Sequence, residues 1–331
     1  MDSFLECIAG EKVALDVAGP YFSRVHSFYG SFGKTAIVEM AAAAGLPMVG
    51  DEKDPTRTTT YGVGELMRHA LEHGANKIIL ALGGSATNDG GCGAAAACGV
   101  RFYDARGEAF IPVGGTLKDI ARMDASELDR TLAALPIITM CDIDNPLCGK
   151  AGAAAVFGPQ KGADEAMVLR LDAGLAHLAD VLERDCGAAV RDLVGAGAAG
   201  GMGAGMAAFF KSRLQMGIET VLDTVGFEEK LSGADLVFTG EGRLDGQSRR
   251  GKVAAGVARR AGARGVPVIA IVGDIGEGAE TIYELGVTAV FSINRVAIPY
   301  EQARLRSRRD LRATAEDVLR LCRSLEIQRK L

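Results

Sequence analysis

The sequence contains no tryptophan, only 5% aromatic residues and four histidines among its 331 residues. Its seven cysteines are odd in number, and none forms a Cys-x-x-Cys pair. This spacing argues against a disulfide framework and against a zinc knuckle, so we expect a reduced, cytoplasmic protein. The cysteines are Cys7, Cys92, Cys98, Cys141, Cys148, Cys186 and Cys322.

Excess positive charge is also missing. The 37 lysines and arginines are outnumbered by 42 aspartates and glutamates, which gives a net charge of −5. Without a basic field the chain is not expected to bind nucleic acid or an anionic membrane. It has no run of eighteen apolar residues and no signal-peptide pattern at Met1. We therefore expect small-molecule ligands and a monomer or homodimer.

Short apolar runs alternate with helical patterns along most of the chain. Runs rich in Val, Ile and Phe, each followed by Gly or Asp, predict buried parallel strands at 77–82, 136–140, 235–239, 267–272 and 288–293. Helical periodicity predicts helices at 62–73, 163–184, 251–262 and 301–325. This alternation is typical of an α/β fold, with helices on both faces of a mainly parallel, Rossmann- or flavodoxin-like sheet. Short strands joined by turns at 13–17, 25–30, 35–40 and 100–111 predict a second, smaller unit beside it.

The first of four candidate ligand loops is the segment GGSATNDGG at 83–91, which follows a predicted strand and precedes a helix. The backbone at Gly84 and the side chains of Ser85, Thr87 and Asn88 can donate hydrogen bonds to an anion at the helix start. Asp89 fits either a helix cap or a metal-binding or basic carboxylate.

The second loop, CDIDNPL at 141–147, follows the strand at 136–140. Alternate residues of an extended segment point the same way, so Asp142 and Asp144 can present two carboxylates to Mg²⁺ or to a hydroxyl group. A plain turn is the alternative. Lys161, between glycines ahead of a helix, suits either a phosphate contact or a surface loop.

The third loop, GAGAAGGMG at 195–203, matches Gly-x-Gly-x-x-Gly but lacks a proper preceding strand. A nicotinamide dinucleotide site is therefore disfavoured. Gly197 and Gly200 either let the backbone approach a substrate or phosphate, or allow close helix packing.

The fourth loop, 239–253, combines Glu241 and Asp245 with Arg243 and Lys252. It is not a Walker A loop, because Val253 stands where a hydroxyl is needed to bind Mg²⁺. Paired acids and bases near a helix start favour phosphate or metal binding, with Glu241 as a metal ligand, over a salt-bridged loop.

Taken in this order, GGSATNDGG, CDIDNPL with VFGPQKGA, GAGAAGG and GEGRLDGQ resemble the bacterial glycerate kinase family, the type I glycerate 2-kinases, over essentially the whole chain. The resemblance implies transfer of the γ-phosphoryl group of ATP to D-glycerate with Mg²⁺, giving 2-phosphoglycerate, in a fold of two α/β domains with the active site between them. We expect residues 1–60 and 270–331 to form one domain and residues 61–269 the other.

The resemblance also implies roles for the loop residues. Ser85, Thr87 and Asn88 would hold phosphate or carboxylate oxygens, while Asp142 or Asp144 would bind Mg²⁺ or orient the hydroxyl group. Glu241, Arg243 and Asp245 would flank the transferred group, and Lys161 and Lys252 would contact phosphate.

The start of the chain departs from the family pattern. Members open with a strand leading to Asp-Ser-Phe-Lys, a helix and an Asp-Gly-Gly-Glu-Gly segment, and this chain begins after both. Asp2-Ser3-Phe4 aligns beyond the second segment. We expect an in-frame upstream segment, or else a weakly active or inactive glycerate- or nucleotide-binding remnant. A nucleotide-dependent oxidoreductase is the third alternative.

Overall fold

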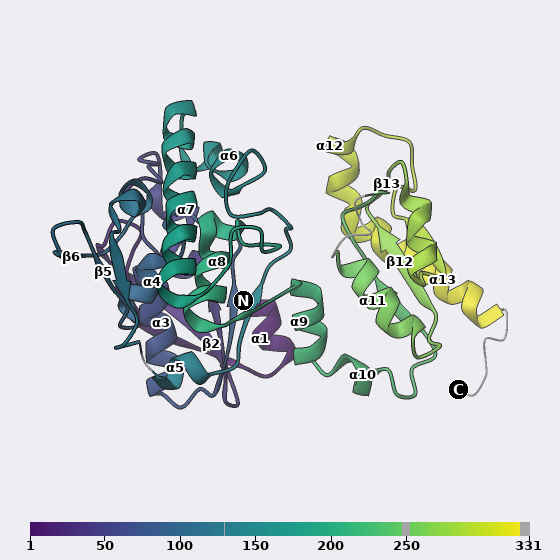
Figure 1. The fold of residues 1–331 in the computed structure, drawn as a ribbon. Coiled ribbons are helices and arrows are strands. Elements are labelled where there is room, and N and C mark those ends of the chain that lie inside the picture. Colours follow the sequence, from purple (N-terminus) through teal and green to yellow (C-terminus); the bar gives the residue numbers. More distant parts are fainter. Residues whose placement is uncertain (129, 247–251, 325–331) are drawn as a thin grey trace. The chain divides into compact units, whose positions relative to one another are not determined.

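The computed structural model describes residues 1–128, 130–246 and 252–324. It divides into two compact units, Met1–Gly217 and Ile218–Leu331, each with its own sheet (Figure 1). The α/β fold class predicted from the sequence is confirmed.

The first unit is built on a six-stranded sheet in the order β1-β2-β3-β4-β8-β9. Pairing is antiparallel from β1 to β3 and parallel from β3 to β9. The parallel strands place their carboxyl ends at one edge, where ligands bind in open α/β sheets. The strands are β1 (Glu11–Ala18), β2 (Arg24–Phe32), β3 (Thr35–Glu39), β4 (Lys77–Ala81), β8 (Ile137–Met140) and β9 (Arg213–Gln215).

The predicted boundaries differ from this division. β3 pairs along its whole length with β4, from Thr35 with Lys77 to Glu39 with Ala81, so residues 1–60 belong with the following 150 residues rather than with 270–331. Of the segments expected in a smaller β unit, only 100–111 lies outside the main sheet. This segment forms β5 (Arg101–Tyr103) and β6 (Ala109–Phe110), which pair with β7 (Arg122–Asp124) in a separate three-stranded sheet.

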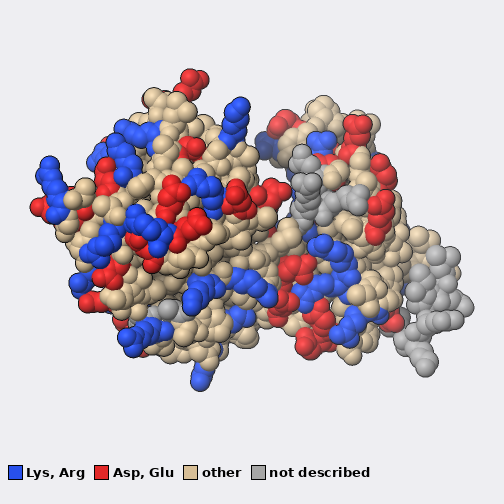
Figure 2. All heavy atoms as spheres, in the orientation of Figure 1, with Lys and Arg blue, Asp and Glu red and all other residues tan. Residues whose placement is uncertain are grey.

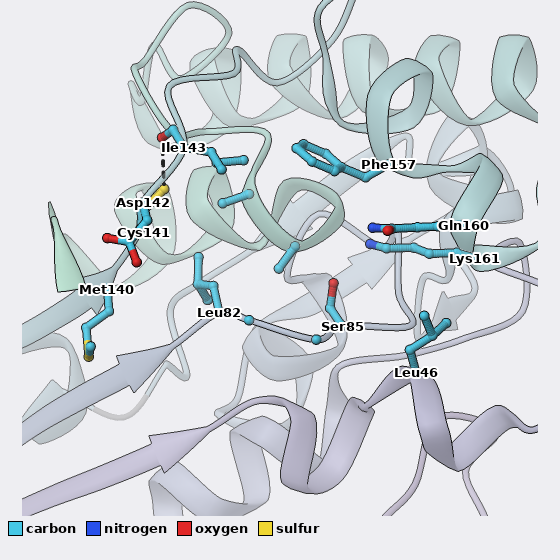
Figure 3. Close-up of a pocket in the computed structure, with 14 residues that line it drawn as sticks. Leu46, Leu82, Ser85, Met140, Cys141, Asp142, Ile143, Phe157, Gln160 and Lys161 are labelled. Atoms are coloured by element: carbon cyan, nitrogen blue, oxygen red, sulfur yellow. Dashed lines mark hydrogen bonds between the residues drawn. The ribbon is translucent and has the colours of Figure 1, made fainter. Parts of the chain in front are cut away.

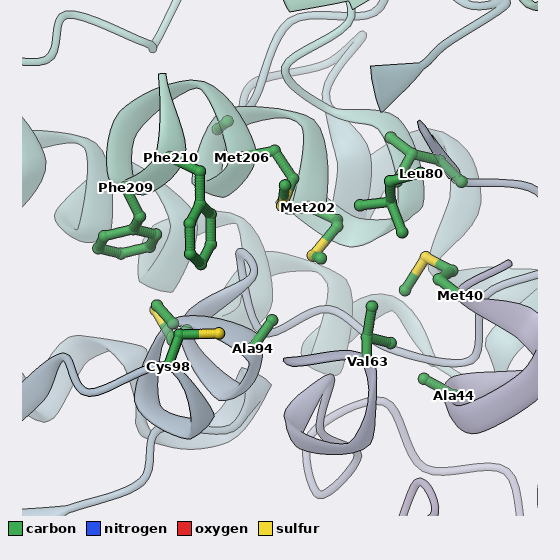
Figure 4. Close-up of a cluster of buried hydrophobic side chains, with 14 of the residues drawn as sticks. Met40, Ala44, Val63, Leu80, Ala94, Cys98, Met202, Met206, Phe209 and Phe210 are labelled. Atoms are coloured by element: carbon green, nitrogen blue, oxygen red, sulfur yellow. The ribbon is translucent and has the colours of Figure 1, made fainter. Parts of the chain in front are cut away.

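Helices of the first unit enclose one apolar core. Figure 4 shows Met202, Met206 and Phe210 facing Val63 and Ala94 across it. The longest helix, α7, begins at the N-cap Asp164, whose carboxylate accepts the Met167 N–H at 2.8 Å, and ends at the left-handed Gly187. The helices are α1 (Asp2–Cys7), α2 (Ala41–Ala44), α3 (Tyr61–Glu72), α4 (Cys92–Ala97), α5 (Arg130–Ala134), α6 (Ala153–Phe157), α7 (Glu165–Cys186) and α8 (Ala198–Phe210), with 3₁₀ turns at Leu46–Val49, Gly114–Asp119 and Pro159–Lys161.

The second unit is a three-stranded parallel sheet, β10 (Val237–Thr239), β12 (Val268–Val272) and β14 (Ala289–Ser292), in that order. Ile269 and Ile271 pack with Val318 of α13 (Ser307–Ser324), so the alternate residues of β12 turn to the opposite face, where α11 (Val253–Gly262) packs. The remaining elements are α9 (Gly217–Thr224), which crosses the unit boundary, α10 (Phe227–Lys230), β11 (Arg243–Leu244), β13 (Asp274–Ile275), the 3₁₀ turns at Ala279–Leu285 and Arg304–Arg306, and α12 (Tyr300–Ala303).

The visible face in Figure 2 carries lysines and arginines interspersed with aspartates and glutamates. Within the three described ranges, no helix combines the length and apolarity needed to cross a membrane.

Candidate functional site

A cavity of about 340 Å³ lies at the carboxyl ends of β4 and β8 in the first unit (Figure 3). Gly83, Gly84 and Ser85 follow β4, and Asp142 follows β8, so the first two sequence-predicted loops meet here. The walls are completed by Leu46, Leu82, Met140, Cys141, Ile143, Phe157, Gln160, Lys161, Ala198 and Ala199.

The β4 loop is fixed by backbone bonds to the segment after β3. Gly84, at φ +74°, accepts a hydrogen bond from Leu46 N at 2.8 Å, and Ala86 N donates to Ala44 O at 2.9 Å. The backbone of Ser85 forms an isolated β-bridge with Gly45. The residue is buried, and its hydroxyl points into the cavity (Figure 3). A hydroxyl carried by a loop whose backbone is fixed in this way is suited to orient a small polar ligand.

Lys161 is the charged residue at the other wall. Its side chain is only 2% exposed, and its Nζ donates to the carbonyl oxygen of Thr87 at 2.6 Å. Burial lowers the pKa of Lys161 to about 7, although the nearby Asp89 acts in the opposite direction. At neutral pH this amine can therefore either carry a positive charge or accept a proton.

Asp89 makes contacts typical of a helix cap. Its Oδ2 accepts hydrogen bonds from Thr60 N at 2.7 Å, from Thr60 Oγ1 at 2.8 Å and from Gly93 N at 3.2 Å. Its Oδ1 accepts one from Gly91 N at 3.2 Å. Burial raises the pKa of Asp89, and these hydrogen bonds partly offset the rise. Of the two alternatives left open by the sequence, the contacts favour the cap, which joins the starts of α3 and α4.

Thr87 and Asn88 are fully buried, and they do not line the cavity. The Thr87 hydroxyl and both polar atoms of the Asn88 amide have no hydrogen-bond partner among the described residues. A buried polar group without a partner costs about 1–3 kcal/mol, so such groups usually gain a water or a ligand.

Asp142 and Asp144 are both exposed, but only Asp142 lines the cavity. In Figure 3 the Asp142 carboxylate lies at the opposite end from Lys161 and Gln160. Its Oδ1 accepts the N–H of Gly217, the first residue of α9, at 2.7 Å. Over the described ranges, no group of three or more His, Cys, Asp or Glu side chains is placed to hold a metal. A Mg²⁺ site would therefore need oxygens from a bound substrate to complete it.

The glycines of the third loop serve close packing. A Cβ at Gly200 would lie 2.0 Å from Thr87 O, and one at Gly197 would lie 2.3 Å from Pro146 O. Ala199, Gly200 and Gly201 open α8 in the left-handed conformation, which brings Ala199 to the cavity wall. No strand precedes them within 187–197, so a dinucleotide fingerprint lacks its structural context.

The fourth loop belongs to the second unit. Glu241 Oε1 accepts the N–H of Ala254 in the first turn of α11 at 3.0 Å, a helix-capping contact. Asp245 pairs with Lys252 at 3.6 Å and with Arg243 at 3.9 Å. Residues 247–251 of this loop are outside the described part of the chain.

Gln160 was missed by the sequence analysis, although it precedes Lys161 directly and faces the same cavity (Figure 3). The segment Phe157–Lys161 could have predicted Gln160, because a turn that orients one polar side chain into a cavity can also orient its neighbour.

Comparisons with known proteins match nearly the whole chain. The sequence profile of the glycerate kinase family matches residues 1–323. A glycerate kinase of Bacillus cereus is 46% identical over 321 residues, covering 96% of this chain and 84% of that protein. A glycerate 2-kinase of Escherichia coli K12 is 46% identical over 280 residues, covering 84% of this chain and 74% of that protein.

A crystal structure assigned to a glycerate kinase 2 from Salmonella typhimurium LT2 superposes with a TM-score of 0.87 at 44% identity. The superposition covers 98% of this chain and 86% of the Salmonella chain. A family match over nearly all residues, relatives at 46% identity and a shared fold lead to one conclusion: this chain belongs to the glycerate kinase family.

Proposed function

We propose that this chain transfers the γ-phosphoryl group of ATP to D-glycerate and forms 2-phosphoglycerate. Family membership supports the reaction class. The observation that carries the assignment to a site is the buried Lys161 at one wall of a cavity whose far end holds Asp142. A small hydroxy acid carries a carboxylate to meet the cation and hydroxyl groups to meet the acid.

In this proposal the Lys161 ammonium group binds the substrate carboxylate, together with the Ser85 hydroxyl and the Gln160 amide. Asp142 orients the reacting hydroxyl and accepts its proton as the new O–P bond forms and ADP leaves with the electrons of the broken P–O bond. Gly84 offers backbone contacts without a side chain in the way.

When bound with ATP, Mg²⁺ would neutralise part of the phosphate charge. Asp144, at the alternate position after Asp142, is the residue that we propose to hold it, in company with phosphate oxygens. Thr87 and Asn88 support the site from behind the cavity, where their unpaired polar atoms can bind water. We place the activity in the cytoplasm, because free thiols at all seven cysteines suit a reducing compartment.

The test is incubation of the purified chain with ATP, Mg²⁺ and D-glycerate, with products identified by phosphorus NMR. We expect ADP and 2-phosphoglycerate in equal amounts. D-lactate, which has the same carboxylate and 2-hydroxyl but no 3-hydroxyl, tests whether the 2-position reacts. ATP hydrolysis without any phosphoglycerate contradicts the proposal, and glycerate binding without turnover supports the remnant alternative.

A further inference from the structure

Two of the four histidines lie next to each other at the end of α3. His69 is in the last turn of this helix, and His73 is its C-cap residue. Residues four apart lie on one face of a helix, on successive turns. The two imidazole rings stack, with their centroids 3.8 Å apart and an angle of 17° between their planes. Histidines at this spacing can bind one metal ion together.

The separation of the two rings suits a shared ion. Two imidazole nitrogens bonded to one tetrahedral ion at about 2.0–2.1 Å are about 3.3 Å apart. The ring centroids of His69 and His73 are only slightly farther apart than this. A small change in the tilt of one ring can close the difference, so the helix does not have to deform to form the site.

The Nδ1 atom of each ring has an oxygen partner within the protein. His73 Nδ1 lies 2.8 Å from the carbonyl oxygen of His69, and a carbonyl only accepts, so this ring carries a proton on Nδ1. His69 Nδ1 lies 3.3 Å from the hydroxyl of Tyr29, which can accept the same kind of bond. Histidines that bind metals usually donate their other N–H to such an oxygen, which fixes the ring. The Nε2 atoms of both rings are then the metal ligands.

The charges around the pair favour a cation. Burial lowers the pKa of His69, and the neighbouring His73 lowers it further, while Glu72 opposes the change. A neutral imidazole is the form that binds metal. Glu72 also places an exposed carboxylate between the two histidines in the sequence. Its ion-pair partner Arg68 donates to Ala97 O at 3.1 Å, so this arginine is held toward the end of α4.

We infer that His69 and His73 form a two-histidine site for a divalent transition-metal ion such as Zn²⁺ or Ni²⁺, with water at the other positions of the ion. Imidazole suits these ions, whereas Mg²⁺ takes oxygen ligands. The pair precedes the start of β4, while the cavity described above lies at the carboxyl end of that strand. The ion is therefore distinct from the Mg²⁺ of the proposed reaction, and the inference does not depend on that reaction.

The experiment is calorimetric titration of the untagged full chain with NiCl₂ near neutral pH, after its exposed thiols have been alkylated. His69→Gln and His73→Gln should each weaken Ni²⁺ binding about 100-fold, because a single imidazole loses the advantage of two linked ligands. His26→Gln is the matched control, since His26 is exposed and pairs with Asp16 instead of a second histidine. Acidification to about pH 5 should release the ion, because protons compete for both rings.

A thermal scan gives a second measurement of the same site. Ni²⁺ should raise the melting temperature of the wild type and of His26→Gln, because the ion binds only the folded chain at this pair, and it should not raise that of His73→Gln. His73 is exposed, so this variant tests the site even if His69→Gln weakens the packing against Tyr29.

Three results would overturn the inference: a wild type that binds no Ni²⁺, equal affinity in the wild type and both variants, or binding that needs only one of the two histidines. The result expected is loss of Ni²⁺ binding in both variants and wild-type affinity in His26→Gln. Glycerate phosphorylation should be the same in His73→Gln as in the wild type, because His73 does not line the cavity. Failure of the kinase proposal therefore leaves the metal site standing, and the reverse also holds.

Discussion

Lys161 donates its ammonium hydrogen to the carbonyl oxygen of Thr87 at 2.6 Å, which joins the 3₁₀ turn before α7 to the loop after β4. This bond holds the Lys161 amine, which is 2% exposed, against the loop after β4. The same carbonyl is the atom that a Cβ on Gly200 would strike, so three segments meet at one peptide group.

Lys161→Met should reduce kcat/KM for glycerate on the order of 100-fold or more, because a buried charge partner of the substrate carboxylate is lost. Steady-state kinetics with D-glycerate as the varied substrate measures this loss. Lys150→Met is the control, since Lys150 is exposed and does not line the cavity. Equal kinetics in both variants would reduce Lys161 to a structural residue.

The pH dependence should follow from the pKa of Lys161, which burial lowers from 10.5 to about 7. As pH rises through 7 the free enzyme loses this positive charge, so kcat/KM for glycerate should fall above pH 7. A pH profile that stays flat to pH 9 contradicts a charged Lys161 in substrate binding.

Stability should change with pH in the opposite direction. Between pH 7 and 10 the unfolded chain keeps a proton on Lys161 that the folded chain has released, so this group makes the free energy of unfolding rise with pH. Urea unfolding at several pH values should therefore show that the free energy of unfolding rises more steeply with pH in the wild type than in Lys161→Met. Parallel curves for the two proteins would show that the folded pKa is unshifted.

Asp142→Asn should lower kcat about 100-fold while the melting temperature changes little. The amide oxygen of asparagine can still accept the Gly217 N–H, so the contact with α9 survives and only the charge and proton acceptor are lost. Asp144→Asn should lower kcat less, because phosphate oxygens remain to hold the Mg²⁺ ion that we assign to Asp144. Wild-type kcat in Asp142→Asn would instead leave this residue only its structural contact with Gly217.

Gly200→Ala should destabilise the first unit by about 3 kcal/mol or more, from the left-handed backbone at φ +70° together with a Cβ placed 2.0 Å from Thr87 O. Gly107→Ala is a matched control for the backbone alone, since its φ is +84° and nothing lies within 4 Å of the added Cβ. We expect that control to cost about 1 kcal/mol in urea unfolding. Equal losses would remove the packing role assigned to Gly200.

The sequence predicts the elements of this fold better than their assembly. The strand at 77–82 and the helix at 163–184 appear within a few residues of their predicted bounds, because hydrophobic periodicity is local. The pairing of β3 with β4 depends on contacts between distant segments, so the predicted domain boundaries missed it.

The candidate site shows the same limit. The glycines and Ser85 that follow β4 predict the first cavity from the sequence alone, because ligands bind at the loops that follow the carboxyl ends of parallel strands. The helix-capping contacts of Asp89 and Glu241 depend on which N–H groups are within reach, which residue type does not reveal. A cavity of the second unit takes half of its lining from Ile293 and later residues, most of them in helices whose apolar positions look like ordinary core residues in the sequence.

The left-handed start of α8 also constrains how the chain folds. Gly90 N–H donates to Gly200 O at 3.0 Å, and a Cβ on Gly205 would lie 2.3 Å from Gly90 O, so two segments more than a hundred residues apart in the sequence touch backbone to backbone. A helix propagates by local bonds and does not enter three left-handed residues unaided. We therefore expect the first turn of α8 to form only after the loop that follows β4 is in place, as a late, non-local step of folding. Amide hydrogens of Gly90 and of the first turn of α8 should accordingly exchange with solvent together, as one cooperative opening.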